Sequence, residues 1–258
     1  HGGRLIARAL RHQGVDTIFT LTGGHILPIL DGCVEEGIRV VDFRHEQAAA
    51  HAAEAYGRLT GRLGVAVVTA GPGVTDTITA VANAWNANTP MLVIGGRHLL
   101  RQELKGGLQE MDHPKLFEGI TAWAATAWQP DRLSDYVATA ARHAFAGRGA
   151  PVFLDVPMDV QFDEVDDSIV FPAVPRSNPL AGADRDTLDA IVAALPRCRR
   201  PMIFAGAGAR GENHLAALAE LLCAPTYLNS RARGSLRHGH PLLGNHSRSQ
   251  AMASTDLV

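Results

Sequence analysis

The sequence has 258 residues, of which 46% are hydrophobic and 19% charged, with a formal net charge of −2, and this is enough chain for one large or two ordinary domains. No basic stripe indicates nucleic-acid binding, no basic amphipathic helix indicates a membrane surface, and no apolar run approaches the roughly 20 residues of a membrane span. The three cysteines lack metal-like spacing and argue against a disulfide framework, and with no visible signal peptide we expect a cytoplasmic protein.

Apolar runs alternate with helical patterns in the first part of the chain. Strands are predicted at 17–21, 39–43, 64–70, 90–96 and 151–157. Helices are predicted at 2–12, 26–36, 46–60, 74–87 and 132–146. The strands are nearly continuous in apolar residues, as parallel strands covered on both faces are. The alternation therefore predicts an α/β fold with a doubly wound parallel sheet.

The pattern changes after Pro157. Segment 158–184 combines an acidic cluster with several prolines and shows no helical period, so we predict an interdomain linker at 161–182. The alternation then resumes with helices at 184–195 and 213–223 and strands at 201–206 and 225–229. We predict a first domain at 1–160 and a second, incomplete α/β domain at 183–258. The start at His1 and the closing "DLV", which resembles the opening of a buried strand, indicate a trimmed chain.

Two glycine turns each follow a predicted strand and precede a helix. They are Gly23–Gly24 and Gly71–Pro72–Gly73, and the turn at 44–46 is placed in the same way. Ligands of open α/β sheets bind outside the carboxyl ends of the strands, where all three turns would lie. One such turn is ordinary strand-to-helix geometry, but three together predict a ligand site.

A third glycine-rich segment, "GAGARG" at 206–211, fits the G-x-G-x-x-G pattern of dinucleotide sites. The acidic residue expected at the end of the next strand is missing, because that strand closes with Asn229. A nicotinamide-binding module is therefore an alternative that depends on this segment alone.

Glu46 opens an alanine-rich helix directly after a strand. It could simply favour the helix start electrostatically. Its small apolar neighbours allow a second possibility, a carboxylate removed from water that shares a proton with a ring nitrogen. Of the histidines, His25 is the one we retain as a candidate, because it follows the first glycine turn. No histidine spacing predicts a metal site.

Five segments occur in an order and spacing typical of one family: "FTLTGGHILPILDG", "VDFRHEQAAAHAAEAYGR", "GVAVVTAGPGVTDTITAVANAW", "GLQEMD" and "GAPVFLDVP". They resemble the pyrimidine-binding domain of thiamine-diphosphate-dependent enzymes, in the acetolactate synthase-like branch. The segment after the linker resembles that family's central domain, so the resemblance covers essentially the whole chain. These motifs are specific to the superfamily and much less specific to the reaction.

The resemblance implies roles for particular residues. Glu46 stands at the family's catalytic glutamate, which hydrogen-bonds the aminopyrimidine of thiamine diphosphate and shares a proton with it. Gly23, Gly24 and the turn Gly71–Pro72–Gly73 would line the cofactor pocket. Gln109 matches a glutamine that approaches bound substrate. The implied activity is carboligation of 2-keto acids such as pyruvate.

Some residues depart from the acetolactate synthase pattern. His25 replaces a small residue, and Leu108 replaces a phenylalanine, so this part looks more like benzaldehyde lyase and the 2-hydroxyacyl-CoA lyases. His25 could then transfer a proton to or from a substrate hydroxyl, and the implied alternative activity is cleavage of acyloins or 2-hydroxyacyl-CoA. Asp76 stands where asparagine is commoner.

The family's diphosphate-binding domain, which holds Mg²⁺, is absent from this sequence. In the family it comes from a second subunit and completes the site at Glu46. The resemblance thus implies at least a homodimer, no metal ligand in this chain, and no turnover by this chain alone. A stand-alone half-site subunit that binds a separate partner chain is an alternative of another class. FAD stays open: Gly206 and Gly208 lie where the resemblance places flavin contacts, whereas "LNSRARGSL" departs from the usual turn.

Overall fold

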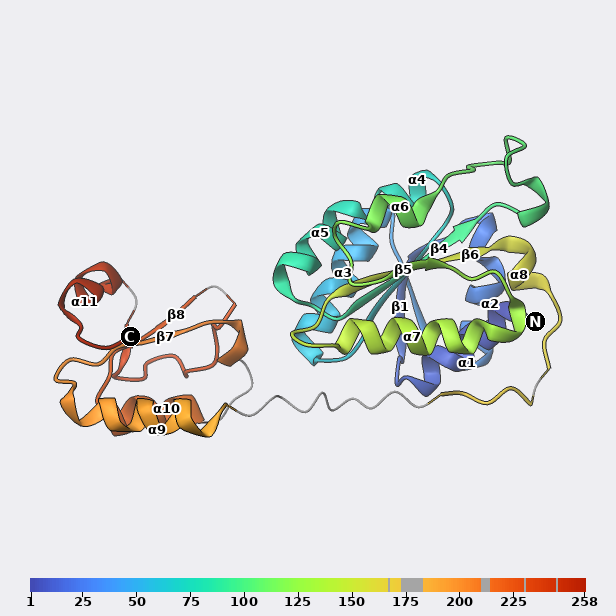
Figure 1. Ribbon diagram of the computed structural model, residues 1–258. Helices are drawn as coiled ribbons and strands as arrows, with labels where there is room; N and C mark the ends of the chain where they lie inside the picture. Colours follow the sequence, from blue (N-terminus) through green and yellow to red (C-terminus); the bar gives the residue numbers. More distant parts are fainter. Residues whose placement is uncertain (167, 173–182, 210–213, 230, 245) are drawn as a thin grey trace. The chain divides into compact units, whose positions relative to one another are not determined.

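The structure, a computed structural model, describes residues 1–166, 168–172, 183–209, 214–229, 231–244 and 246–258. The chain divides into two compact units, His1–Leu180 and Ala181–Val258 (Figure 1). Much of the predicted linker, residues 173–182, lies outside the described residues, so its extent stays a prediction. Among the described residues, no helix combines the length and the apolar character that crossing a membrane requires.

The first unit is built on a six-stranded sheet in the order β2-β1-β3-β4-β6-β5, and every pairing is parallel. The strands are β1 (Thr17–Leu21), β2 (Arg39–Asp42), β3 (Gly64–Val68), β4 (Met91–Arg97), β5 (Ala124–Thr126) and β6 (Pro151–Pro157). The main helices are α1 (Gly2–His12), α2 (Leu27–Glu35), α3 (Glu46–Thr60), α4 (Pro72–Thr75), α5 (Ile78–Ala87), α6 (His113–Phe117), α7 (Leu133–Phe145) and α8 (Met158–Phe162).

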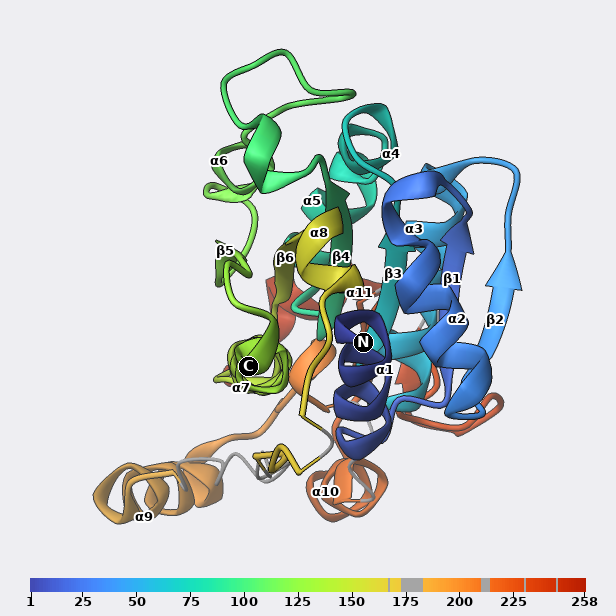
Figure 2. The same cartoon turned by 90° about the vertical axis from the view of Figure 1, so that its right-hand side faces the viewer.

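Helices cover both faces of this sheet, and the strand side chains alternate between two cores. In β3, Val65 and Val67 join the core under α1, α2, α7 and α8, whereas Ala66 and Val68 join the core under α3, α5 and α6. Figures 1 and 2 show the two helical layers with the sheet between them. The predicted doubly wound parallel sheet is therefore confirmed.

Helix α3 lies very close to the sheet. A Cβ atom built on Gly64 would stand 1.9 Å from the carbonyl oxygen of Ala53, so only glycine fits there. Ala49, Ala50 and Ala53 are all fully buried on the sheet-facing side of the helix. The alanines thus serve the packing of α3 on its own sheet.

The ends of α3 are defined by local chemistry. His45 is the N-cap, and its Nδ1 atom accepts a hydrogen bond of 3.1 Å from the backbone N–H of Gln47. The helix ends at Gly61, whose φ of 70° is left-handed, as is common after a helix. Glu46 is consequently the first residue of the helix, as predicted.

Two predictions of local structure were wrong. The helix expected at 74–87 is two helices, α4 and α5, because the chain turns at Thr77, whose buried hydroxyl donates back to the Val74 carbonyl at 2.7 Å. Segment 158–184 was expected to lack helix, yet it begins with α8. That short helix is held by Gln161, a fully buried amide that donates to the carbonyls of His25 and Val156.

Three elements of the first unit, β5, α6 and α8, were not predicted. Strand β5 has only three residues, Ala124–Thr126, and lacks the β-branched run that marks the other strands. Past α8, Val165, Ile169 and Phe171 pack against the core under α1. Tertiary contacts with the sheet therefore impose these elements on weak local patterns.

The second unit contains a three-stranded parallel sheet in the order β7-β8-β9, formed by β7 (Ile203–Ala205), β8 (Thr226–Leu228) and β9 (Leu243–Gly244). Its helices are α9 (Arg185–Ala194), α10 (His214–Leu222) and α11 (Arg248–Ser254). Leu257, in the segment predicted to open a strand, makes an isolated parallel bridge with Pro201. The second, smaller α/β unit is confirmed.

We predict that Gly64→Ala destabilises the protein by about 1–3 kcal/mol, because the added methyl must push α3 away from β3. The measurement is the free energy of urea unfolding. Gly119→Ala is the control, since a Cβ there meets nothing within 4 Å. Equal stabilities of the two variants would contradict the close packing described here.

Candidate functional site

The order of the strands reverses between β1 and β3, and this switch point is where open parallel sheets bind ligands. The turn after β1 carries Gly23, and β3 is followed by Thr69. A Cβ on Gly23 would lie 2.5 Å from the Cβ of Thr69, so the absence of a side chain lets the two turns touch. The two predicted glycine turns therefore meet at the switch point.

The helix start at Glu46 joins this contact. A Cβ on Gly73 would lie 2.7 Å from Cγ2 of Thr69 and 3.3 Å from Oε1 of Glu46. Thr69 is thus the point around which the turns after β1, β2 and β3 converge. The structure brings together Gly23, Glu46 and Gly73, which the sequence predicted to share one edge. Gly24 stands beside them with open space where a Cβ would be.

The turn after β3 has a backbone that suits glycine alone. Gly71 has φ 61° and ψ −115°, a region that side chains exclude. Pro72 follows as the exposed first residue of α4. A Cβ on Gly71 would come within 2.8 Å of the Cβ of Gln109, so the predicted substrate residue lies directly against this turn.

Glu46 is half-buried in this chain, whereas the second possibility that its alanine neighbours allowed was a carboxylate removed from water. The difference arises because Ala49, Ala50 and Ala53 face the sheet, whereas Ala48 is exposed. A second surface would have to cover the carboxylate to exclude water from it. The catalytic role of Glu46 stays a prediction.

His25 is buried, with 7% of its surface exposed, and its Nδ1 atom lies 3.1 Å from Oγ1 of Thr69. Burial lowers the pKa of the imidazole, which favours the neutral ring, while the Leu108 backbone opposes this shift. Gly96 makes the burial possible, because a Cβ there would lie 2.6 Å from the Cβ of His25. The second glycine of "IGG" therefore makes room for a site residue.

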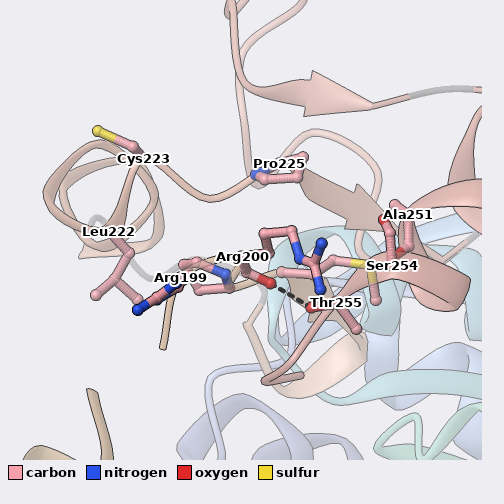
Figure 3. A pocket seen from close by; sticks show the side chains of 10 residues that line it. Arg199, Arg200, Leu222, Cys223, Pro225, Ala251, Ser254 and Thr255 are labelled. Atoms are coloured by element: carbon pink, nitrogen blue, oxygen red, sulfur yellow. Dashed lines mark hydrogen bonds between the residues drawn. The ribbon is translucent and has the colours of Figure 1, made fainter. Parts of the chain in front are cut away.

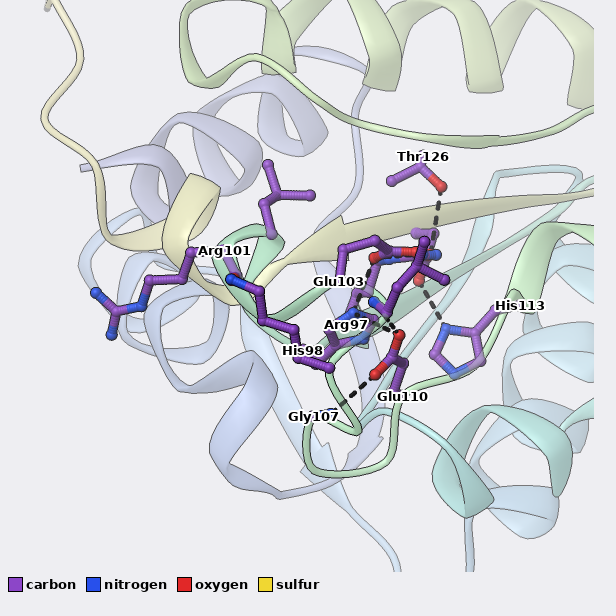
Figure 4. Close-up of polar contacts among 12 residues, drawn as sticks. Arg97, His98, Arg101, Glu103, Gly107, Glu110, His113 and Thr126 are labelled. Carbon is purple, nitrogen blue, oxygen red and sulfur yellow. Dashed lines mark hydrogen bonds and ion pairs between the residues drawn. The ribbon is translucent and has the colours of Figure 1, made fainter.

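A buried network underlies the turn after β3 (Figure 4). The Gly71 N–H donates to Nε2 of His113 at 2.9 Å, and Nδ1 of His113 lies 2.9 Å from Oδ1 of Asp155. The other oxygen of Asp155 accepts from Nη1 of Arg97 at 2.7 Å and from the Thr126 hydroxyl at 3.3 Å. His113 and Asp155 are both fully buried.

The same network extends into the loop that carries Leu108 and Gln109. Nη2 of Arg97 donates to both carboxylate oxygens of Glu103, at 2.7 and 2.9 Å, and these bonds lower the pKa of Glu103. His98 reaches Glu103 through Nε2 at 2.8 Å. Glu110 accepts from the backbone N–H groups of Leu104 and Gly107, as Figure 4 shows in part. Ion pairs and hydrogen bonds from backbone N–H groups to a carboxylate thus hold this loop.

Sequence reasoning missed this network. The signal was present, because Asp155 interrupts an otherwise apolar strand and Arg97 ends another. Charged side chains are almost never buried without a partner, so a charge inside an apolar strand indicates a buried ion pair or hydrogen-bond network.

Two groups of possible metal ligands occur among the described residues, with ligand atoms within 4.8 Å of one another. One is formed by His45, Glu46 and Asp76, and the other by His98, Glu103 and Glu110. The first is largely exposed, and in the second Glu103 is already engaged by Arg97. Neither geometry favours a metal over the ion pairs present.

The predicted flavin contacts lie in the second unit. Gly206 is half-buried, Gly208 is exposed, and a Cβ on Gly208 would meet nothing within 4 Å. Residues 210–213 of the same glycine-rich segment lie outside the described residues. A pocket of about 340 Å³ in this unit is lined by Arg199, Arg200, Cys223 and Thr255 among others, and neither glycine lines it (Figure 3). The flavin contacts stay a prediction.

Two family models match the chain. Residues 1–116 match the N-terminal TPP binding domain of thiamine pyrophosphate enzymes, and residues 188–258 match the central domain of the same enzymes. The first match contains the site at the switch point, and together the two matches span most of the sequence.

Curated relatives agree with these matches. The chain is 38% identical over 264 residues to the acetolactate synthase large subunit IlvG of Mycobacterium tuberculosis, covering 100% of this chain and 48% of that protein. It is 36% identical over 295 residues to 2-hydroxyacyl-CoA lyase 2 of Mus musculus and 35% identical to that of Homo sapiens, covering 100% of this chain and 47% of each. The chain spans about half the length of the curated relatives it matches. It belongs to the thiamine pyrophosphate enzyme family, in the branch that includes acetolactate synthases and 2-hydroxyacyl-CoA lyases.

Proposed function

We propose that this chain forms the pyrimidine-binding half of the active site of a thiamine-diphosphate-dependent carboligase that acts on 2-keto acids such as pyruvate. One observation carries the proposal: the Glu46 carboxylate lies beside Gly73, a position without a side chain, at the switch point of a parallel sheet. The similarity to acetolactate synthases supports this choice of reaction.

The residues present fit the cofactor's ring. The Cβ that Gly73 lacks would stand 3.3 Å from Oε1 of Glu46, so glycine keeps the space beside the carboxylate open. A Cβ on Gly24 would meet nothing within 4 Å. We propose that Gly23, Gly24, Gly71, Pro72 and Gly73 line the cofactor pocket.

Bound thiamine diphosphate would supply an electron sink for negative charge at the substrate's carbonyl carbon. Glu46 would hold and transfer a proton at its carboxylate, and Gln109, against the turn at Gly71, would face the substrate. Because Glu46 is half-buried here, we propose that a second subunit covers it and excludes water. We further propose that Mg²⁺ binds outside this chain, that FAD contacts Gly206 and Gly208 if it binds, and that the enzyme works in the cytoplasm.

A second candidate activity is cleavage of acyloins or 2-hydroxyacyl-CoA. It is favoured by His25, because a buried imidazole with a lowered pKa is neutral at pH 7 and can accept a proton from a hydroxyl group. The similarity to 2-hydroxyacyl-CoA lyases agrees with this alternative.

We predict that Glu46→Gln in the native full-length protein lowers kcat/KM for pyruvate by about 10²–10⁴-fold, the usual loss when a proton-transferring group is removed. The assay measures turnover with added thiamine diphosphate and Mg²⁺. The substitution keeps the size of the side chain at a half-buried position, so the fold should persist. Glu118→Gln, at an exposed position, is the control. Undiminished turnover by Glu46→Gln would contradict the assignment.

His25→Ala separates the two candidate activities. If cleavage is the reaction, the variant should lose most of its cleavage activity toward 2-hydroxyacyl-CoA or acyloins. It should still bind thiamine diphosphate, because the lost imidazole accepts the proton of the substrate hydroxyl and does not hold the cofactor. If carboligation of pyruvate is the reaction, that activity should survive the substitution. The two assays are run on the same preparation, with cofactor binding measured by isothermal titration calorimetry.

The lowered pKa of His25 also predicts a pH dependence of stability. The unfolded state, with a histidine pKa near 6.5, binds more protons than the folded state. The contribution of His25 to folding is therefore fully present above that value and is lost as the pH falls through the folded pKa. His25→Asn should flatten the fall in unfolding free energy on the acid side, measured by urea unfolding at a series of pH values. A slope identical to that of the wild type would contradict the neutral, buried state of His25.

A further inference from the structure

His113 is a fully buried histidine whose two ring nitrogens both have partners. The Gly71 N–H donates to Nε2, so Nε2 is the acceptor. Nδ1 must then carry the hydrogen of the neutral ring and donate to Oδ1 of Asp155 at 2.9 Å. The network fixes one tautomer of a neutral imidazole, which bridges a carboxylate and a backbone amide.

That backbone amide belongs to the glycine of the proposed cofactor turn. Gly71 is buried, and its φ of 61° suits glycine alone. Its N–H points into the core toward His113. Without an acceptor there, a buried N–H would remain unpaired and the turn would lose stability. His113 therefore holds the turn that is proposed to line the cofactor pocket.

Asp155 anchors the neighbouring loop as well. Its second oxygen binds Arg97, and Arg97 binds Glu103 of the loop that carries Gln109. Gln109 in turn lies against Gly71, where a Cβ would approach within 2.8 Å. One buried carboxylate thus connects two segments whose relative position matters for the proposed site: the turn beside Glu46 and the loop that carries Gln109.

We propose that His113 is a positioning residue: its Nε2 atom accepts from the Gly71 N–H and so fixes the turn Gly71–Gly73 relative to Glu46 and Gln109. Its effect on cofactor binding rests on the proposed function. Its effect on the backbone does not, because the hydrogen bonds exist in the chain itself. A ring that merely filled space, such as phenylalanine, would leave Gly71 without an acceptor.

The test compares His113→Gln with His113→Asn in the native full-length protein. The glutamine amide reaches the position of Nε2 and can accept from Gly71, whereas the asparagine amide reaches only the position of Nδ1 and can bond Asp155. Both variants remove the same aromatic ring from the core, so both should lose thermal stability. Thr121→Val is the control, since it removes a buried hydrogen bond, to the Phe117 carbonyl, that does not involve Asp155.

Two readouts are measured for each variant: hydrogen exchange of segment 69–76 by mass spectrometry, and the thiamine diphosphate concentration for half-maximal activity. His113→Asn should raise both the exchange rate of the segment and the half-maximal thiamine diphosphate concentration by about tenfold, the effect of one lost hydrogen bond to a buried amide. His113→Gln should stay within about threefold of the wild type in both, because it restores the acceptor. Thr121→Val should leave both readouts unchanged.

Equal exchange of segment 69–76 in the glutamine and asparagine variants would overturn the inference, because a role in core packing alone does not distinguish them. If the wild-type protein shows no dependence on thiamine diphosphate, the proposed function is wrong. The exchange measurement still decides the role of His113 in that case, with the same two outcomes.

Discussion

The buried carboxylate of Asp155 is the interaction on which the site depends. A charge inside a sheet costs several kcal/mol unless its partners are close and well oriented, and here Arg97, His113 and Thr126 all point at it. These partners belong to β4, α6 and β5, so satisfying one charge fixes three elements around the end of β6. The turn after β3 and the loop after β4 then take their positions from these elements.

Missing side chains are the second constraint. Gly23 and Gly73 bring three turns onto Thr69, and Gly96 makes room for His25. Gly64 does the same for α3, which brings Glu46 to the edge of the sheet. Close backbone approach therefore places the polar groups, and the hydrogen bonds then hold them.

Most of the fold followed from sequence patterns. The apolar runs predicted five strands of the large sheet, and the glycine turns predicted that segments far apart in the chain meet at one edge of it, because buried parallel strands and the turns after them leave a strong local pattern. Strand β5 and helix α8 were missed, since Ala124–Thr126 and Met158–Phe162 are short and are stabilised by contacts with distant residues.

The candidate site was predicted less completely. Positions next to the glycine turns were found, whereas His113, Arg97 and Asp155 were not, because their significance arises only when β4, β6 and α6 are brought together. The alanines near Glu46 left the burial of its carboxylate open for a similar reason: the sequence does not say which side of α3 faces the sheet. In the structure that side carries Ala49, Ala50 and Ala53.

The central claim is that the cofactor's pyrimidine ring binds against Glu46 at the switch point between β1 and β3. The most direct measurement is a crystal structure of the native full-length protein with thiamine diphosphate bound. The account predicts a ring nitrogen within hydrogen-bonding distance of the Glu46 carboxylate, about 2.6–3.2 Å, with Gly73 against the ring. A cofactor bound elsewhere, with Glu46 facing solvent, would contradict it.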